Sequence, residues 1–251
     1  MLISVIIITL NEANNIESTI RSARLAAQWP SGRSFPIEII ISDGNSIDNT
    51  IMIAQKIADK VITGSPGRFR QLNEGVRHAK GDILVFLHAD TLLPKGAIIK
   101  IHKVMKNSNI IGGGFEKSWN WNPNIKRSSF VKLLNFLWEG FDNWIVRFFK
   151  TFPGDNVIFV RRNMFSELNG YKKLWICEGF DFMRRLKAYG KKKIYCIPLQ
   201  VLTSARRLEN YGFLKTKTIW FFIYWLWRLG MSPERLRVRF KKYATEPELS
   251  I

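Results

Sequence analysis

Two polar side chains, His88 and Asp90, follow directly on an apolar run, Ile-Leu-Val-Phe-Leu, at residues 83–87. The run has the length of a buried strand and is too short for a helix. Open α/β sheets bind ligands at the carboxyl ends of their strands. An aspartate there, with a histidine two residues before it, suits a divalent ion that also holds substrate phosphates. The alternative is an ordinary turn, with Pro94 starting the next helix.

Three earlier apolar runs are likewise followed by polar side chains. They span residues 2–8, 37–41 and 60–63, and each is a predicted strand. Segments with helical periodicity lie between them, so the pattern predicts an α/β fold with a doubly wound, mostly parallel sheet flanked by helices. Parallel strands bring their carboxyl ends to one edge, and we expect the polar groups to converge there. These groups are Asn11, Glu12, Asp43, Arg68, Arg70, His88 and Asp90.

The remaining elements are predicted from composition and periodicity. Residues 64–70 are expected to form a glycine- and arginine-bearing loop, with a helix over 71–79. A helix rich in Phe, Leu and Trp is predicted over 130–149. We expect most of its aromatic side chains to pack in the core, and stacking on sugars is the alternative. Residues 194–197 and 200–203 are expected to form short edge strands.

The composition points to an anionic partner in a reducing compartment. The 251 residues carry a formal charge of +19, which suits nucleic acid, an acidic membrane surface or a phosphorylated substrate. Two cysteines do not make a disulfide scaffold, and a cytoplasmic location is expected. The N-terminal apolar run lacks a basic region before it, so it is interpreted as a strand and not a signal peptide. No apolar run reaches the roughly 18 residues of a membrane span.

An aromatic segment at residues 219–227 lies between basic residues and precedes a basic run. Such a helix suits the interface of an anionic bilayer, so we expect peripheral contact with the inner face of a membrane. The alternative is a helix buried against the domain or against a dimer partner. The basic residues of the run are Arg235, Arg237, Arg239, Lys241 and Lys242.

Several segments resemble the signature of family 2 glycosyltransferases, which have the GT-A fold and use nucleotide-diphosphate sugars. They read SVIIITLNE at 4–12, SDGNSIDNT at 42–50 and FLHADT at 86–91. Further segments resemble a bacterial subgroup labelled arsenosugar-biosynthesis-like glycosyltransferases. These read GRFRQLNEG at 67–75, SARR at 204–207 and GMSPERL at 230–236. The resemblance covers nearly the whole chain.

The resemblance implies a donor site at the strand ends. It assigns contacts with the nucleotide base and ribose to Thr9, Asn11, Glu12 and Asp43. Arg68 can clamp a phosphate or a base edge through its planar fork. Donor contacts are also implied for Ala89, Arg206 and Arg207; the two arginines can bind the diphosphate or an anionic acceptor, or simply form surface salt bridges. Asp90 is the first metal ligand, and His88 is a second ligand or a diphosphate donor, a pair that favours Mn²⁺ over Mg²⁺.

The general base departs from the family pattern. Family 2 enzymes carry a Glu-Asp pair whose aspartate takes the acceptor proton. Here Glu178 is retained, Gly179 stands at the aspartate position and Asp181 lies one helical turn on. The candidates are therefore Asp181 and Glu178, followed by Asp155, which is expected to orient the acceptor. A base within reach contributes ~10²–10⁴-fold to the rate.

The resemblance favours an inverting, metal-dependent glycosyltransferase acting on an unknown lipid-linked or phosphorylated acceptor, with a UDP-sugar as the default donor. A silent nucleotide-sugar binder is one alternative, which Gly179 supports. A nucleic-acid-binding protein is another, although no helix-turn-helix, zinc or RNA-binding motif is visible and no nucleic-acid partner is expected. We expect a nucleotide-sugar half at 1–115, an acceptor half of the same domain at 116–209, and an aromatic helix with a basic tail at 210–251.

Overall fold

The computed structural model describes residues 1–240. Its strands are β1 (Ile3–Thr9), β2 (Ile37–Asp43), β3 (Lys60–Thr63), β4 (Ile83–His88), β5 (Thr91–Leu92), β6 (Gly112–Asn120), β7 (Ile158–Arg161) and β8 (Ile194–Ser204). Its α-helices are α1 (Ile16–Ala26), α2 (Thr50–Gln55), α3 (Arg68–His78), α4 (Ala97–Met105), α5 (Ser129–Phe149), α6 (Arg162–Glu167), α7 (Glu178–Ala188), α8 (Arg206–Tyr211), α9 (Phe213–Arg228) and α10 (Pro233–Arg239). Two short 3₁₀ helices are η1 (Gly154–Asn156) and η2 (Lys191–Lys193).

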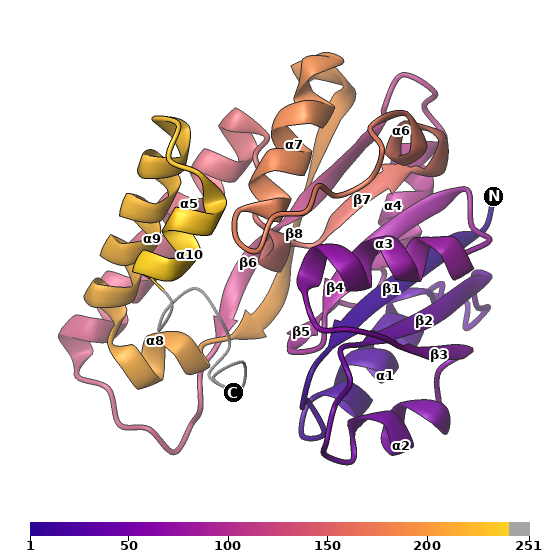
Figure 1. Cartoon of the computed structure of the whole chain (residues 1–251). Coiled ribbons are helices and arrows are strands. Elements are labelled where there is room, and N and C mark those ends of the chain that lie inside the picture. Colours follow the sequence, from indigo (N-terminus) through magenta and orange to yellow (C-terminus); the bar gives the residue numbers. More distant parts are fainter. Residues whose placement is uncertain (241–251) are drawn as a thin grey trace.

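The strands form one sheet in the order β3-β2-β1-β4-β7-β6-β8-β5 (Figure 1). The first four in this order are parallel, and β7 joins them antiparallel to β4. The register sets Thr9 opposite Asp43 and Ile8 opposite His88. The polar strand ends therefore lie side by side at one edge. This mixed α/β arrangement is the fold class that the sequence predicts.

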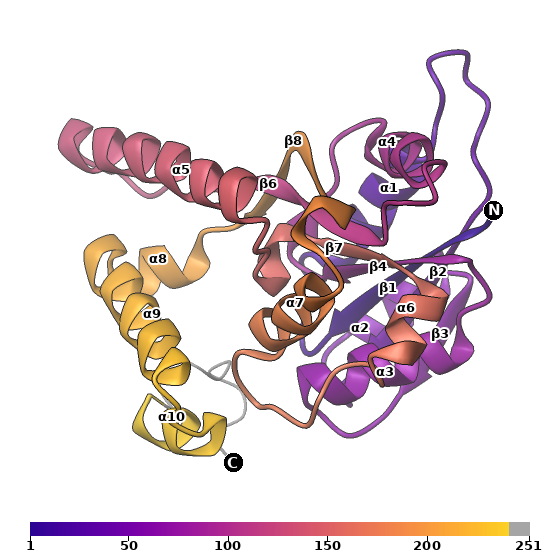
Figure 2. The same ribbon diagram turned by 90° about the horizontal axis from the view of Figure 1, so that it is seen from above.

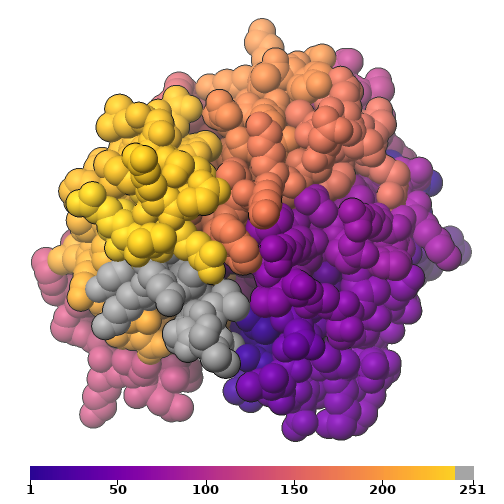
Figure 3. All heavy atoms as spheres, viewed as in Figure 1, coloured from indigo at the N-terminus to yellow at the C-terminus, as the bar shows by residue number. Residues whose placement is uncertain are grey.

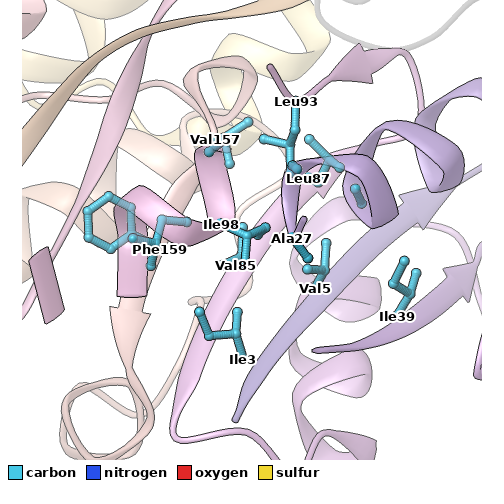
Figure 4. Packing of buried hydrophobic residues seen from close by; sticks show 14 of the residues in the cluster. Ile3, Val5, Ala27, Ile39, Val85, Leu87, Leu93, Ile98, Val157 and Phe159 are labelled. Atoms are coloured by element: carbon cyan, nitrogen blue, oxygen red, sulfur yellow. The ribbon is translucent and has the colours of Figure 1, made fainter. Parts of the chain in front are cut away.

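Both faces of the central strands are buried. On β1, Ile3, Val5 and Ile7 face the helices α1 and α4, whereas Ile6 and Ile8 belong to a second cluster with α3, α6 and α7. Figure 4 shows part of the first cluster. Successive strand residues point to opposite faces, so a strand covered on both sides needs the uninterrupted β-branched run that the sequence shows.

The glycines of β6 allow close strand packing. A Cβ on Gly113 would lie 1.9 Å from the carbonyl oxygen of Tyr195 on β8, and one on Gly114 would press against the ring of Phe152. The register shift of this strand falls one residue later, between Phe115 and Glu116. The predicted domain boundary at 115/116 thus falls inside one continuous strand.

Two sequence predictions about the elements are wrong. Residues 194–197 and 200–203 are not separate edge strands but one strand, β8, which pairs with both β6 and β5. The helix expected at 71–79 begins earlier, at Arg68, because Gly67 (φ 134°) provides the sharp turn before it. Arg68 and Arg70 are therefore helical.

The C-terminal helices and α5 lie beside the sheet (Figures 1 and 2). The inner side of α9 buries Ile223 against Ile176, Cys177 and Leu236. None of the helices in residues 1–240 combines the length and the apolar composition that crossing a bilayer requires. The last predicted basic residues, Lys241 and Lys242, lie outside the described residues.

Candidate active site

Asp43 is the centre of a hydrogen-bond network at the ends of β1 and β2. Its carboxylate accepts from Thr9 Oγ1 at 2.6 Å, and from Ser46 N–H at 2.7 Å and Ser46 Oγ at 2.5 Å. Ser46 Oγ accepts from the N–H of Asn11, whose Oδ1 accepts from the N–H of Ile47. Asn11 has φ 50°, a conformation that asparagine tolerates. These bonds fix the polar groups of two neighbouring strand ends.

Arg206 bridges the ends of β1 and β4. Its Nη2 contacts Oε1 of Glu12 and lies 3.4 Å from Oδ2 of Asp90. Asn15 Nδ2 donates to the other carboxylate oxygen of Glu12 at 2.7 Å. Burial raises the pKa of Glu12, and Arg206 acts in the opposite direction. One guanidinium therefore compensates acidic groups that follow β1 and β4.

His88 lies among charged groups from four elements. Burial lowers its pKa, the charge of Arg68 lowers it further, and Asp90, Asp155 and Glu178 act in the opposite direction. The net direction is downward, so the imidazole is neutral near pH 7. These side chains come from the end of β4, from η1, and from the first turns of α3 and α7. The structure thus brings together residues separated by up to 110 positions in the chain.

Glu178 opens α7 and faces Arg68, with Oε1 at 3.6 Å from Arg68 Nη1. Close packing explains why the next residue, Gly179, has no side chain. A Cβ on Gly179 would lie 3.0 Å from the backbone nitrogen of Gly154, and a Cβ on Gly154 would lie 3.0 Å from His88 Nε2. A side chain at position 179 would therefore crowd the backbone of η1, and Glu178 is the acidic side chain that remains at this place.

Asp181 is held in an ion pair on the inner side of α7. It accepts from Arg185 Nε at 2.7 Å and lies 3.2 Å from Arg184 Nη2. Arg185 also donates to the carbonyl oxygens of Leu168 and Gly170. The carboxylate is 5% exposed. These contacts occupy both oxygens of Asp181, and they fasten α7 to the end of α6.

Asp155 pairs with a lysine that the sequence analysis did not single out. Lys117 Nζ on β6 donates to Asp155 Oδ2 at 2.7 Å, and the lysine side chain is 9% exposed. Burial acts to raise the pKa of Asp155, but the charge and hydrogen bond of Lys117 outweigh it and hold the pKa at about 2. Asp155 is therefore an anion throughout the physiological range and a poor proton acceptor.

The remaining residues predicted from the sequence, Ala89 and Arg207, lie near these groups. Two further residues that the sequence analysis did not indicate, Gln71 and Lys117, lie there too. Ala89 is buried, and its carbonyl oxygen accepts from Thr19 Oγ1 at 2.6 Å. Arg207 follows Arg206 in α8, and its carbonyl accepts from Thr216. Gln71 was missed: it donates to the carbonyls of Thr9 and Ser42 and so ties α3 to both strand ends. Its position in the arginine segment 67–75 was the available signal, whereas no pattern marked Lys117.

We expect the Lys117–Asp155 pair to contribute to stability in a pH-dependent way. The Asp155→Asn variant leaves a buried lysine without its carboxylate and should lose roughly 3 kcal/mol of unfolding free energy at pH 7. The double variant Asp155→Asn/Lys117→Met should recover part of this loss. The pKa of Asp155 is depressed from 3.8 to about 2, so its contribution is present above pH 4 and fades as the pH falls toward 2. Urea unfolding between pH 2.5 and 7 measures the contribution of the pair. An equal loss of unfolding free energy in the single and the double variant would contradict the pairing.

The comparisons with known proteins decide the family. Residues 4–200 match the family described as Glycosyl transferase family 2. The chain belongs to this family. Over 132 residues this glycosyltransferase family member is 32% identical to the dolichol-phosphate mannosyltransferase of Pyrococcus furiosus, a match covering 47% of the chain and 36% of that protein. The chain spans about a third of the length of the curated relatives it matches.

Solved structures of glycosyltransferases share the fold. S. aureus TarS in complex with UDP-GlcNAc is 19% identical, with a TM-score of 0.58, over 81% of this chain and 58% of that one. The mannosyltransferase PcManGT of Pyrobaculum calidifontis, in complex with GDP-Man and Mn²⁺, is 18% identical with a TM-score of 0.57, over 96% of this chain and 67% of that one. At this identity the likeness shows the GT-A fold that the sequence predicts.

The side chains at the end of β4 fit a divalent ion that is coordinated partly by the protein and partly by a bound substrate. Within residues 1–240, no group of three or more His, Cys, Asp or Glu side chains could hold an ion by itself. Asp90 offers a carboxylate and His88 a neutral imidazole, two positions apart. Mg²⁺ and Mn²⁺ sites of this kind use one or two protein ligands and fill the rest with phosphate oxygens and water.

Proposed function

We propose that this protein is an inverting, metal-dependent glycosyltransferase that moves a sugar from a nucleotide-diphosphate sugar, UDP-linked by default, to a lipid-linked or phosphorylated acceptor. The observation that carries the proposal is the cluster around His88. It combines two ligands for a divalent ion, two arginines for a diphosphate and one carboxylate, Glu178, for an acceptor hydroxyl. We also propose membership of the arsenosugar-biosynthesis-like subgroup, because its segments supply Arg68 and Arg206.

The donor is proposed to lie along the strand ends. Thr9, Asn11 and Asp43 would hold the base and ribose through the network that Ser46 fixes, with Glu12 and Ala89 at its border. Arg68 and Arg206 would bind the diphosphate, with Arg207 beside them. Arg206 now contacts two carboxylates, and a diphosphate offers it a charge-assisted, bidentate partner instead. A divalent ion bound at Asp90 and His88 would neutralise charge on the departing diphosphate.

Glu178 is proposed as the general base, and Asp181 as a structural anion. Glu178 faces Arg68 at 3.6 Å, whereas both carboxylate oxygens of Asp181 are held by Arg184 and Arg185. In the transfer step the acceptor oxygen bonds to the anomeric carbon on the face opposite the diphosphate. The carbon–oxygen bond to the diphosphate breaks with its electron pair, and the acceptor proton passes to the carboxylate of Glu178. Displacement from the opposite face inverts the configuration. Asp155, fixed as an anion by Lys117, would orient the acceptor.

Measurement of turnover, together with the anomeric configuration of the product, tests this proposal. The protein is incubated with each UDP-, GDP- and CDP-sugar, Mn²⁺, and either phosphorylated polyols or polyprenyl phosphate as acceptor. Release of nucleoside diphosphate and the anomeric proton coupling of the product are then measured. We expect acceptor-dependent release and a β-linked product from an α-linked donor. A product with retained configuration would contradict the base on the opposite face, and donor binding without any release would favour a silent binder.

Peripheral contact with an anionic membrane is part of the proposal. The outer side of α9 leaves large apolar side chains in solvent, while its inner side packs on α7 and α10. The exposed residues are Leu214, Phe221, Phe222, Trp225 and Leu229. Basic residues of α10 follow them. This arrangement supports placement on the inner face of a membrane, where a lipid-linked acceptor would be within reach.

A further inference from the structure

The helix α5 is amphipathic in the reverse sense: its apolar side faces solvent. Large apolar side chains recur at spacings of three and four residues along its whole length, and each is about half exposed or more. These residues are Phe130, Leu133, Phe136, Leu137, Phe141, Trp144, Phe148 and Phe149. We name them the α5 stripe. Most exposed apolar residues occur singly, and a continuous row of this length marks a contact surface.

Three polar residues of α5, Glu139, Asp142 and Asn143, face the protein and are hydrogen-bonded to it. Asn143 exchanges two hydrogen bonds with the backbone of Lys117, and Asp142 accepts from Lys217 Nζ at 2.7 Å. Glu139 accepts from the Trp119 N–H and from Ser118. These bonds fix the rotation of the helix about its axis. The helix cannot turn its apolar side inward without breaking them, so the exposure of the stripe is built into the fold.

The rings of the stripe are ordered against one another. Phe141 and Trp144 stack with centroids 6.2 Å apart, and Trp144 and Phe148 stack at 5.6 Å. Figure 2 shows α5 projecting from the sheet. The exposed fractions of the stripe residues show that the rest of the described chain leaves this side uncovered. A helix of 21 residues at 1.5 Å per residue gives the stripe a length of about 30 Å.

Lysine side chains lie beside the stripe. Both acidic residues of α5 point inward, and its exposed charged residues are Lys132 and Arg147, of which Arg147 is paired with Glu116 of β6. Lys191 of η2 sits over the rings of Phe148 and Phe149, at 4.9 and 5.6 Å from their centroids. The next two residues, Lys192 and Lys193, are exposed lysines. An aromatic row with cations along its border is complementary to an anionic lipid surface.

We propose that the α5 stripe docks this protein on an anionic bilayer, with α5 lying in the interfacial plane. A second copy of the chain is a poorer occupant, because a two-fold contact through the same stripe would bring like charges together on a molecule of formal charge +19. The docking deepens the membrane contact of the proposed function, on which it rests, by assigning it to α5, and it does not depend on the donor or the base. It would set β6, whose Lys117 holds Asp155, next to the lipid surface.

Vesicle binding tests the proposal with a matched pair of variants. Phe141→Ser/Trp144→Ser removes two stripe residues that are 52% and 55% exposed, and Leu25→Ser/Met52→Ser removes two apolar residues of α1 and α2 that are each 50% exposed. Full-length protein is sedimented with vesicles of equal parts phosphatidylglycerol and phosphatidylcholine. We expect the stripe variant to bind at least tenfold more weakly, since it loses the apolar area that enters the interface, and the matched variant to bind like the wild type. Equal binding of all three proteins would overturn the proposal.

Two further measurements separate the alternatives. The charge reversal Lys132→Glu/Lys191→Glu should abolish the preference for phosphatidylglycerol over pure phosphatidylcholine vesicles, and an unchanged preference would contradict the role of the cations. In the absence of lipid, sedimentation velocity should give a monomer; a dimer that the stripe variant dissociates would identify a second copy as the occupant instead. Thermal shift with donor reports on the donor site alone, so loss of docking and failure of the proposed function are distinguishable.

Discussion

Replacement of Glu178 by glutamine should lower the rate of sugar transfer by ~10²–10⁴-fold while leaving donor affinity nearly unchanged. Glutamine keeps the shape of the side chain and can still face Arg68, 3.6 Å away, but it cannot take the acceptor proton. The loss should therefore appear in kcat and not in the dissociation constant of the donor. Nucleoside diphosphate release under saturating donor, combined with donor titration, measures the two effects separately.

Asp181→Asn is the matched control for this prediction. Asp181 is buried and pairs with Arg185, so its neutralisation should cost roughly 3–5 kcal/mol of unfolding free energy. The folded fraction should retain transfer activity per molecule. If Asp181→Asn removes turnover at unchanged stability, and Glu178→Gln does not, the general base is Asp181 and not Glu178.

Asp90→Asn should weaken Mn²⁺-dependent donor binding at least 100-fold, about 2.8 kcal/mol at 25 °C. The amide supplies a poorer ligand for a hard cation than the carboxylate does, and His88 alone cannot replace it. Binding of the nucleotide in EDTA should change little, since Thr9, Asn11 and Asp43 are untouched. Calorimetric titration of the nucleotide with Mn²⁺ and with EDTA gives both affinities.

The control for Asp90→Asn is Asp82→Asn, which removes an aspartate that is 67% exposed and lies before β4. It should bind donor and Mn²⁺ like the wild type. Arg206 keeps its contact with Glu12 in the Asp90→Asn variant, so a large loss of stability is not expected. Equal Mn²⁺ stimulation of binding in Asp90→Asn and the wild type would remove Asp90 from the metal site.

The convergence of the strand ends could be predicted because it follows from topology. Parallel strands with alternating helices leave one edge for their carboxyl ends, and the apolar runs before Asn11, Asp43 and His88 identify the strands. The partners of those groups could not be predicted. Arg206 reaches Glu12 across 194 positions, and Lys117 reaches Asp155 from the antiparallel part of the sheet, whose order has no local signal.

The orientation of α5 could not be predicted for a different reason. Helical periodicity defines an apolar side and a polar side, but it does not say which side faces the protein. The expectation that its aromatic residues pack in the core is wrong for the α5 stripe. Asp142, Asn143 and Glu139 find their partners on β6 and α9, and these specific hydrogen bonds override the tendency of apolar residues to be buried.

Figure 3 shows the surface where the N-terminal half, the α6–α7 segment and the C-terminal helices meet.

A thermal-shift panel of UDP, GDP, CDP and their sugars, each with Mn²⁺, Mg²⁺ or EDTA, is the most direct test for a metal-dependent donor site. One nucleotide class should stabilise the protein by roughly 2.7 kcal/mol at a hundred times its dissociation constant, a rise in Tm of about 5–10 °C that EDTA removes. No shift with any nucleotide in either metal would contradict the donor site.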